Sequence, residues 1–303
     1  MSLDGGTRIK AHLDGVAVST LVVCCFVWGL NQVAIKVTNG GLQPLFQAGL
    51  RSLLACLLVV AWCRVRRIPL FERDGTLIAG VVAGLLFGAE YVLVFIGLDF
   101  TSASRGIVFL YSMPLMVAVG AHFFIPGERL TVMKTVGFAS AFAGIDIVLS
   151  DKLSLPSPRA LIGDARCLGG VLAWAATTLV IKRSRLATTS AEKLLVYQLA
   201  VSAVMLLALA PFYGPFLRDF TGLVAAAFAF QVVIVVSVSY LVWFWMLSRY
   251  PAARLSSFVF LTPLFGVALG WLLLSEPLSP WLLLALALVA FGIYLANRPE
   301  RAA

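Results

Sequence analysis

One stretch of this sequence is present twice, and the repeat limits what the chain can fold into. Residues 240–264 align without a gap on residues 91–115, at an offset of 149 positions. The aligned pairs include types that rarely coincide by chance: Tyr91 with Tyr240, Phe95 with Phe244, Arg105 with Arg254, and Pro114 with Pro263. An ungapped internal match of this kind predicts that the chain folds as two related halves.

The match continues on both sides of this stretch at offsets between 146 and 149. The further pairs are Trp28 with Trp174, Lys36 with Lys182, and Glu128 with Glu276. We therefore divide the chain into a first repeat, residues 1–150, and a second repeat, residues 151–303.

The composition decides the class of protein. Hydrophobic residues make up 61% of the chain and charged residues 12%, with a mean hydropathy of +0.99. A soluble domain carries about a quarter charged residues, so this chain is predicted to be an integral membrane protein. Its net charge of +9 does not indicate nucleic acid, because the basic residues flank apolar stretches, as topology signals do. The expected partners are a lipid bilayer and a small-molecule substrate.

Ten apolar stretches are long enough for a helix to cross a bilayer, which takes about 20 residues. They are 16–37, 44–63, 75–98, 102–124, 131–149, 163–181, 191–211, 221–247, 252–274 and 278–296. The connections between them are too short to form a soluble catalytic domain. The sequence thus predicts an all-α integral membrane protein of ten transmembrane helices.

Lysine and arginine predict the orientation of these helices. Sixteen of them fall on the side of the N-terminus and six on the other, so both termini are expected in the cytoplasm of a bacterial inner membrane. Each repeat holds five spans, an odd number, so the second repeat enters the membrane inverted. Inverted repeats are typical of secondary transporters, whose substrates bind near the midplane where the halves meet.

Small residues and prolines add details of packing. Residues 80–88 read GxxxGxxxG and residues 266–270 read GxxxG, and such faces let helix backbones approach closely. Pro114 and Pro263 lie within spans at equivalent places in the two repeats. Each removes a helix hydrogen bond, so the pair predicts either two fixed bends or a shared hinge.

Together these features resemble the EamA group of the drug/metabolite transporter superfamily. The residues that carry the resemblance are Trp28-Gly-Leu-Asn, Arg51-Ser-Leu-Leu-Ala, Pro114-Leu and Glu128, with weaker counterparts at Trp174, Gln198, Pro263-Leu and Glu276. The resemblance implies the same ten-helix fold and a carrier, not an enzyme. It also implies export of metabolites, amino acids among them, with one branch that takes aromatic amino acids.

Polar residues inside the spans are candidate functional groups because burying them in lipid costs about 2.5–3.5 kcal/mol on insertion scales. Glu90 is either one member of a structural pair or a site for a proton or a substrate amine. Arg51 either anchors its helix at the surface or binds a substrate carboxylate. Asn31 and Thr178 either contact the head of a substrate or join helices.

Large aromatic residues at mid-span depth suggest the kind of substrate. Tyr91 and Phe95 lie on one face of a helix, and their counterparts Tyr240 and Phe244 do the same. The other mid-span rings are Tyr111, Trp174 and Phe260. These rings either line a cavity for an apolar or aromatic solute or pack in the helix core. Interfacial belts, in contrast, hold Trp and Tyr at the membrane surfaces.

No catalytic triad, paired-carboxylate motif or nucleotide-binding fingerprint occurs in the sequence. The five cysteines include no CxxC pair, so we expect neither a metal nor a cofactor. The predicted function is a secondary transporter that exports small metabolites by alternating access, with a preference for amino acids that have aromatic or bulky apolar side chains. An exporter of drug-like molecules, sugars or nucleotide sugars is the alternative, and a membrane scaffold or membrane-embedded enzyme is a remote one. Nothing in the sequence fixes the oligomeric state.

Overall fold

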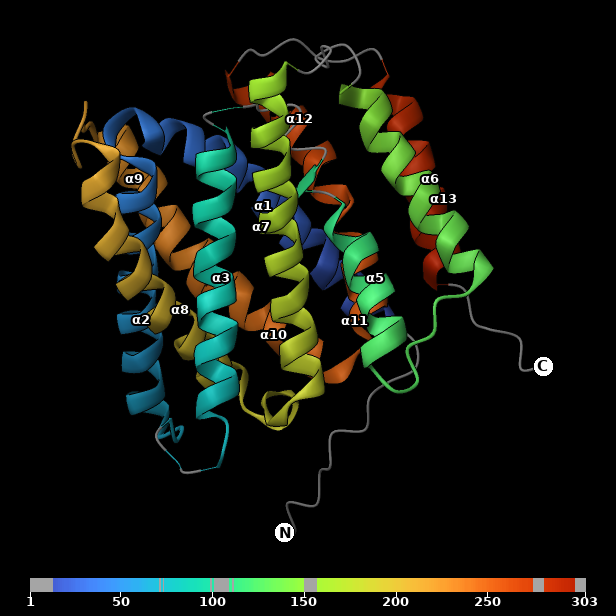
Figure 1. The fold of residues 1–303 in the computed structure, drawn as a ribbon, viewed down its shortest axis with the longest axis horizontal. Helices are drawn as coiled ribbons and strands as arrows, with labels where there is room; N and C mark the ends of the chain where they lie inside the picture. Colours follow the sequence, from blue (N-terminus) through green and yellow to red (C-terminus); the bar gives the residue numbers. More distant parts are fainter. Residues whose placement is uncertain are drawn as a thin grey trace.

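The computed structural model describes residues 13–70, 72, 74–98, 100, 109–110, 112–149, 157–274 and 281–297. Nearly all of them lie in helices that run roughly side by side across one long bundle (Figure 1). The first repeat holds α1 (Gly15–Gly41), α2 (Pro44–Arg66), α3 (Leu77–Leu98), α5 (Met113–Phe124) and α6 (Val132–Leu149). The second holds α7 (Pro158–Arg183), η2 (Arg185–Thr188), α8 (Ala191–Leu209), η3 (Ala210–Tyr213), α9 (Gly222–Phe230), η4 (Gln231–Ser239), α10 (Tyr240–Arg249), α11 (Ala252–Phe258), α12 (Leu261–Leu274) and α13 (Leu282–Asn297).

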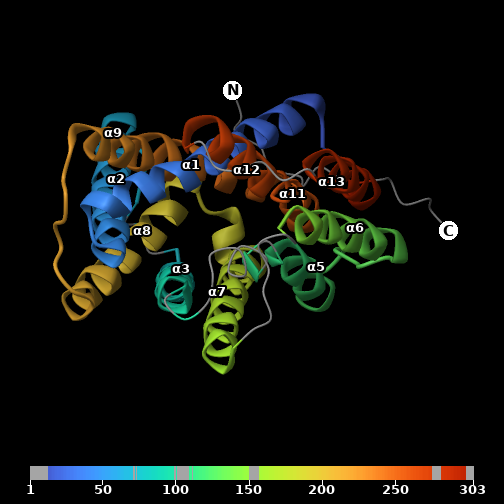
Figure 2. The ribbon, with the colours of Figure 1, turned by 90° about the horizontal axis from the view of Figure 1, so that it is seen from above.

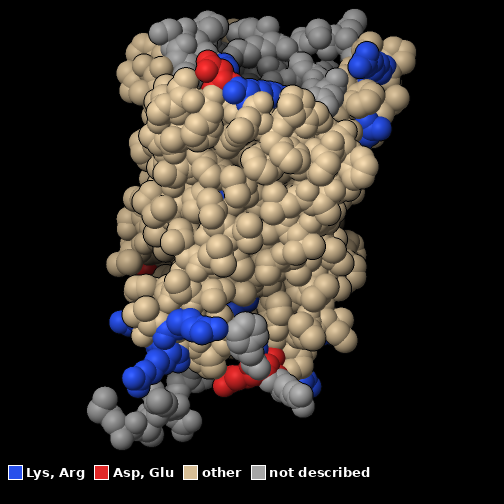
Figure 3. Space-filling view, turned by 90° about the vertical axis from the view of Figure 1, so that its left-hand side faces the viewer, with Lys and Arg blue, Asp and Glu red and all other residues tan. Residues whose placement is uncertain are grey.

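Each of the ten predicted spans contains at least one of these helices, so the predicted all-helical fold is confirmed. Seven helical stretches in the described part of the chain are long and apolar enough to cross a membrane. Their outer faces carry large exposed apolar side chains such as Leu57, Ile78 and Val204. On the face shown in Figure 3, charged residues gather at the two ends of the molecule, and the surface between them is almost entirely uncharged. This surface matches a hydrocarbon layer bounded by water on both sides.

The start of the sixth span differs from its prediction. We predicted Gly163 as the first residue, but α7 begins at Pro158. Ser157 caps the helix by accepting a hydrogen bond from the Ala160 N–H at 3.1 Å, and Pro158 occupies the first turn, where its missing N–H costs nothing. Hydropathy alone missed this polar first turn.

The packing of helices repeats between the two halves (Figure 2). The equivalent helices α2 and α8 pack on each other, and so do α6 and α13. Other contacts occur in exchanged pairs. Helix α5 packs on α7, and its counterpart α12 packs on α1; α3 packs on α7, and α9, from the equivalent span, packs on α1. Such exchange is what a two-fold relation between inverted halves requires, and it leaves the interface between the halves running through the centre of the bundle.

Glycines allow the closest of these approaches, as the sequence predicted for residues 80–88. A Cβ atom on Gly84 of α3 would lie 2.6 Å from the Cβ of Val201 on α8. On the other side of the molecule, a Cβ on Gly137 of α6 would lie 2.7 Å from the carbonyl oxygen of Gly292 on α13. Neither position can hold a side chain without moving a neighbouring backbone.

The ninth span is broken rather than bent. Helix α11 ends at Phe258 and α12 begins at Leu261, two residues before Pro263. The Thr262 N–H turns to the Val259 carbonyl at 3.0 Å, and the Phe258 carbonyl instead accepts a hydrogen bond from the Cys25 thiol of α1 at 3.2 Å. In the fourth span Pro114 lies in the first turn of α5. The prolines thus start new helical segments in both repeats. Whether these segments act as hinges stays a prediction.

Candidate functional site

Two tyrosines that the repeat makes equivalent meet at the centre of the bundle. The Tyr91 hydroxyl of α3 lies 3.3 Å from the Tyr240 hydroxyl of α10. Tyr91 is the fifteenth of the 22 residues of α3, and Tyr240 follows the nine residues of η4 deep inside the eighth span. Both residues are partly buried. Two equivalent side chains in contact mark the place where the two halves face each other.

Other rings pack against this tyrosine pair, most of them edge-on. Phe87 packs against Tyr91 with ring centres 5.2 Å apart and against Tyr240 at 6.2 Å. Trp28 of α1 lies 6.5 Å from Tyr240, and its indole N–H donates a hydrogen bond to the Ser239 hydroxyl at 2.8 Å. Phe95 stacks on the other side of Tyr91 at 6.1 Å. Edge-to-face contacts of this kind hold aromatic rings in defined orientations, so the cluster is a pre-formed apolar surface with hydroxyls at its centre.

Arg51 joins the tyrosine pair from α2. Its guanidinium lies 5.0 Å from the centre of the Tyr91 ring, and the residue is only 2% exposed. It therefore does not anchor α2 by reaching the membrane surface, which was one of the two interpretations of the sequence. Its Nη1 donates a hydrogen bond of 3.3 Å to the Gln231 side-chain oxygen, and its Nε has no partner in the described structure.

Gln231 holds this arginine in place. Its Oε1 also accepts from the Gln47 amide at 3.2 Å, while its Nε2 donates to the Thr38 hydroxyl at 2.8 Å. The amide of Gln231 is thus fixed by α1 and α2 together, with its oxygen aimed at Arg51. Sequence reasoning missed Gln231 and Gln47, although a glutamine inside an apolar stretch is the same kind of signal as Glu90.

Gln231 begins a nine-residue π-helix, η4, that interrupts the eighth span between α9 and α10. Its wider turn is seen in the bond from the Tyr240 backbone N–H to the carbonyl of Val235, five residues earlier. The segment is rich in valine and isoleucine, which restrict χ1 and weaken α-helix formation. Single π turns are frequent at functional sites, and this one sets the directions of both Gln231 and Tyr240.

Glu90 and Trp174 lie on the neighbouring helices α3 and α7, which pack on each other. On α3, Gly97 touches Cys167 of α7, and Val94 touches Gly170. Continuing this antiparallel register by one turn brings Glu90 to the level of Trp174. Glu90 is half-buried, and its Oε2 has no partner among the described residues.

The other predicted site residues differ in their distance from the tyrosine pair and in their partners. Asn31 is 8% exposed, and its Oδ1 has no described partner. Thr178 bonds the carbonyl of Trp174 at 3.4 Å, and Phe244 is buried in the apolar core beside the aromatic cluster. Phe260 is fully buried and packs on Phe138 of α6 at 6.1 Å, so the structure does not bring it to the tyrosine pair. Tyr111 lies outside the described residues.

A separate set of contacts joins four segments at one end of the bundle. The Lys182 ammonium of α7 donates to the Tyr250 carbonyl at 2.6 Å and lies 3.8 Å from the Glu128 carboxylate, which follows α5. Glu128 also accepts from the Ala252 N–H at the start of α11, and the Tyr250 hydroxyl donates to Asp14 before α1. We call Asp14, Glu128, Lys182, Tyr250 and Ala252 the end cluster. It fastens elements of both repeats together.

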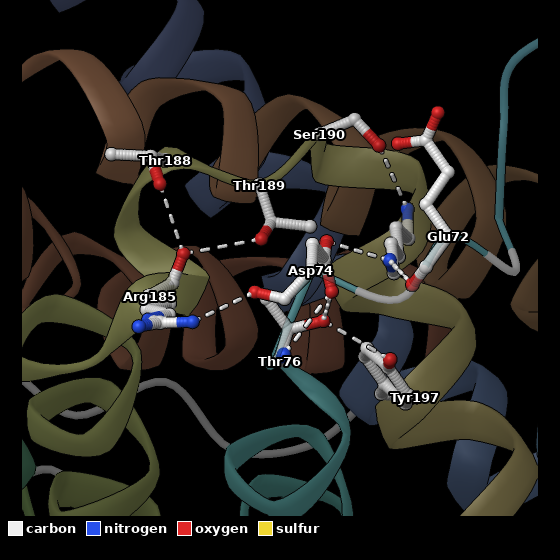
Figure 4. Close-up of polar contacts among 9 residues, drawn as sticks. Glu72, Asp74, Thr76, Arg185, Thr188, Thr189, Ser190 and Tyr197 are labelled. Carbon is white, nitrogen blue, oxygen red and sulfur yellow. Dashed lines mark hydrogen bonds and ion pairs between the residues drawn. The ribbon is translucent and has the colours of Figure 1, made fainter.

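A second polar cluster fixes the loop between α2 and α3 to the start of α8 (Figure 4). The Asp74 carboxylate accepts from the Lys193 ammonium at 2.7 Å and from the Thr76 hydroxyl at 2.6 Å. These hydrogen bonds hold the pKa of Asp74 well below its usual range, and the bond from Lys193 has the largest effect. Arg185 donates to the Asp74 backbone carbonyl. Lys193 and Thr76 are buried, and their polar groups are satisfied by Asp74, so we assign the cluster a structural role.

The described residues contain no group of three His, Cys, Asp or Glu side chains placed to hold a metal ion. The five cysteines are buried as free thiols, as expected for small core residues. The chemistry that the central cluster offers is therefore recognition: flat apolar faces, hydroxyls, one guanidinium and one carboxylate.

Comparison with known proteins identifies the family. The profile of the EamA-like transporter family matches the chain twice, over residues 15–150 and 161–298. The chain belongs to this family. The resemblance seen in the sequence is thus confirmed, and the protein is a multi-pass membrane transporter rather than an enzyme.

Several known proteins are similar to this chain over nearly its whole length. An uncharacterized transporter of Bacillus subtilis, YoaV, is 24% identical over 91% of this chain and 94% of its own length. A probable amino-acid metabolite efflux pump of Escherichia coli is 25% identical over 93% of this chain and 94% of its own length. One solved crystal structure superposes with a TM-score of 0.79 at 18% identity, covering 92% of this chain and 96% of that one, which supports the fold alone.

Proposed function

We propose that this protein exports small metabolites, chiefly amino acids with aromatic or bulky apolar side chains, across a bacterial inner membrane. In this proposal residues 1–150 and 151–303 are the two inverted repeats, both termini are cytoplasmic, and the repeats rock about the centre of the bundle. The relatives named as probable amino-acid metabolite efflux pumps support the substrate class.

The observation that carries the proposal is the contact between Tyr91 and Tyr240 within the aromatic cluster. Both side chains are only partly buried, and they come from opposite halves, as a midplane site requires. A substrate ring that packs here gains about 0.5–1.5 kcal/mol for each aromatic contact beyond simple burial. Two or three such contacts give the modest affinity that an exporter needs in order to release its cargo.

The site residues take the following roles. Tyr91, Phe95, Trp174 and Tyr240 contact the side chain of the substrate, and Asn31 and Glu90 face its polar head. Phe244 supports the rings from the core. Pro114 and Pro263 separate the helical segments that reorient when the repeats rock. Because transport is driven by solute or ion gradients, no cofactor or metal is required, and Glu90 is a candidate for proton coupling.

Flux into liposomes that hold the purified protein tests this proposal. We expect saturable uptake of labelled phenylalanine and tryptophan, with weaker uptake of threonine and none of a nucleotide sugar. Tyr240→Ala and Tyr91→Ala should raise KM for phenylalanine by about tenfold or more, since each removes one or two ring contacts. Val204→Ala, on a lipid-facing surface, serves as the control. Uptake of the nucleotide sugar in place of amino acids would refute the proposed substrate class and leave the transporter family standing.

A further inference from the structure

We infer that Arg51 and Glu90 bind the two charged ends of a zwitterionic substrate, so that the site selects an α-carboxylate together with an α-ammonium group. This inference rests on the proposed function and adds the chemical feature by which the site recognises its cargo. It follows from the unused bonding capacity of the two residues.

Arg51 has too few partners for a buried guanidinium. An arginine carries five N–H donors and is always charged, and burying such a charge is costly unless it is paired. In the described structure Arg51 makes one side-chain hydrogen bond, to a neutral amide at 3.3 Å, and one contact with the Tyr91 ring. Its Nε points to no acceptor. The acceptor that suits a guanidinium fork best is a carboxylate, which can take two parallel hydrogen bonds.

The network around Arg51 keeps this capacity available. Gln231 offers only one oxygen, and that oxygen already accepts from Gln47. The other end of the Gln231 amide is held by Thr38, so the amide cannot turn to serve the guanidinium better. The guanidinium is therefore positioned by its neighbours without being neutralised by them.

Glu90 supplies the opposite charge. Its Oε2 is buried without a donor among the described residues, and the residue lies directly before Tyr91 on α3. Neither Arg51 nor Glu90 forms an ion pair with a described residue. The tyrosine pair lies beside both. A site with a guanidinium and a carboxyl group that both lack an ionic partner among the described residues, set around an aromatic surface, is complementary to an amino acid with a ring.

Other solute classes leave part of this arrangement unmatched. A neutral sugar compensates neither charge, an organic anion compensates only Arg51, and an amine compensates only Glu90. A buried polar group that a ligand leaves unpaired costs more than the bond itself returns, so each of these should be rejected.

The test compares three labelled compounds that share one ring: phenylalanine, phenylalaninamide, which lacks the carboxylate, and 3-phenylpropionate, which lacks the amine. Uptake by liposomes with the unmodified protein should favour phenylalanine by about tenfold to a hundredfold over either analogue, the range set by one charged hydrogen-bonded contact. Arg51→Gln should bring phenylalanine down to the level of phenylalaninamide while leaving the latter unchanged. Glu90→Gln should bring phenylalanine uptake down to the level of 3-phenylpropionate and leave the uptake of 3-phenylpropionate unchanged.

Two controls separate recognition from folding. Arg51→Lys keeps the charge without the fork and should retain part of the preference for phenylalanine over phenylalaninamide. Arg66→Gln removes an exposed arginine from the same helix, stacked on Trp62 at 5.4 Å, and should leave all three fluxes unchanged. Equal loss of all three compounds in Arg51→Gln would show that Arg51 only stabilises the bundle and would overturn the inference.

The flux results that would refute this inference differ from those that would refute the proposed function. If the unmodified protein carries all three ring compounds equally, the aromatic site stands and zwitterion recognition is wrong. If it carries threonine in preference to any ring compound, the aromatic preference is wrong. The inference about the charged ends of the substrate then stands if Arg51→Gln abolishes the threonine flux. Flux of a nucleotide sugar alone overturns both.

Discussion

Replacing Glu128 by Gln should loosen the end of the bundle that the end cluster holds together. The carboxylate lies 3.8 Å from the Lys182 ammonium, and the two side chains are 12% and 5% exposed. Two unit charges at this separation interact by about 4 kcal/mol at an effective dielectric constant of about 20. Glutamine removes that charge and keeps an oxygen for the Ala252 N–H, and Lys182 keeps the Tyr250 carbonyl. The net loss is therefore about 1.5–3 kcal/mol, which is the usual worth of a hydrogen bond to a charged group.

A loss of this size shifts the balance between closed and open forms of this end by about tenfold to a hundredfold. The change is measurable at Thr178, which lies one helical turn from Lys182 toward the centre of α7 and is 4% exposed. In Thr178→Cys protein without other cysteines, Glu128→Gln should raise the rate of alkylation by a charged maleimide by at least tenfold. The matched control, Glu192→Gln, alters an acidic residue in the first turn of α8 and should leave the rate unchanged.

The inverted repeat adds a second expectation for this experiment. Lys36 is the sequence counterpart of Lys182, so Lys36→Gln should shift the balance in the opposite direction and lower the alkylation rate of Thr178→Cys. The reasoning would be refuted if Glu128→Gln left the rate unchanged while transport and folding were intact. It would also be refuted if both substitutions changed the rate in the same direction.

Three further predictions concern stability and the central site. Asp74→Asn should lower the thermal stability measured in detergent at neutral pH. The Lys193 ammonium depresses the pKa of Asp74 in the folded protein. The stability that Asp74 contributes is therefore complete above its unfolded-state pKa, near 3.8, and is lost as the pH falls through its folded-state pKa. The difference between Asp74→Asn and the unmodified protein should therefore persist at pH 5 and shrink steadily below about pH 4. Gly292→Leu should separate α13 from α6, since a Cβ there meets the Gly137 carbonyl, and lower the melting temperature by several degrees, whereas Gly222→Ala, where a Cβ meets nothing, should not. Tyr240→Phe removes one hydrogen bond and no ring, so it should raise KM for phenylalanine far less than Tyr240→Ala.

The sequence predicted the part of the site that the repeat defines. Tyr91 and Tyr240 were paired by alignment before any contact was known, and the structure brings their hydroxyls together. A two-fold relation forces this result, because equivalent residues near the axis must meet. Phe260 was chosen for its mid-span depth alone, and it lies in a different part of the core. Depth along a span does not say which way a side chain points.

The sequence also left the role of Arg51 undecided between the membrane surface and the substrate. Its distance from the end of α2, about 10 Å, allows a long side chain to reach the surface. The structure instead turns it inward to Gln231 and Tyr91. That choice depends on the π-helix η4, which directs Gln231 toward α2, and local sequence gives no reliable signal for a π-helix.

The sequence by itself determined the membrane class, the ten spans and the repeat, because hydrophobicity and self-similarity are properties of the chain read in order. It also determined which helices are equivalent. The tertiary structure decided which faces of those helices meet, where the ninth span breaks, and that Arg51 and Glu90 remain unpaired beside the tyrosine pair. These features depend on the rotation and register of neighbouring helices, which are set by packing at glycines such as Gly84 and Gly137 rather than by any one segment.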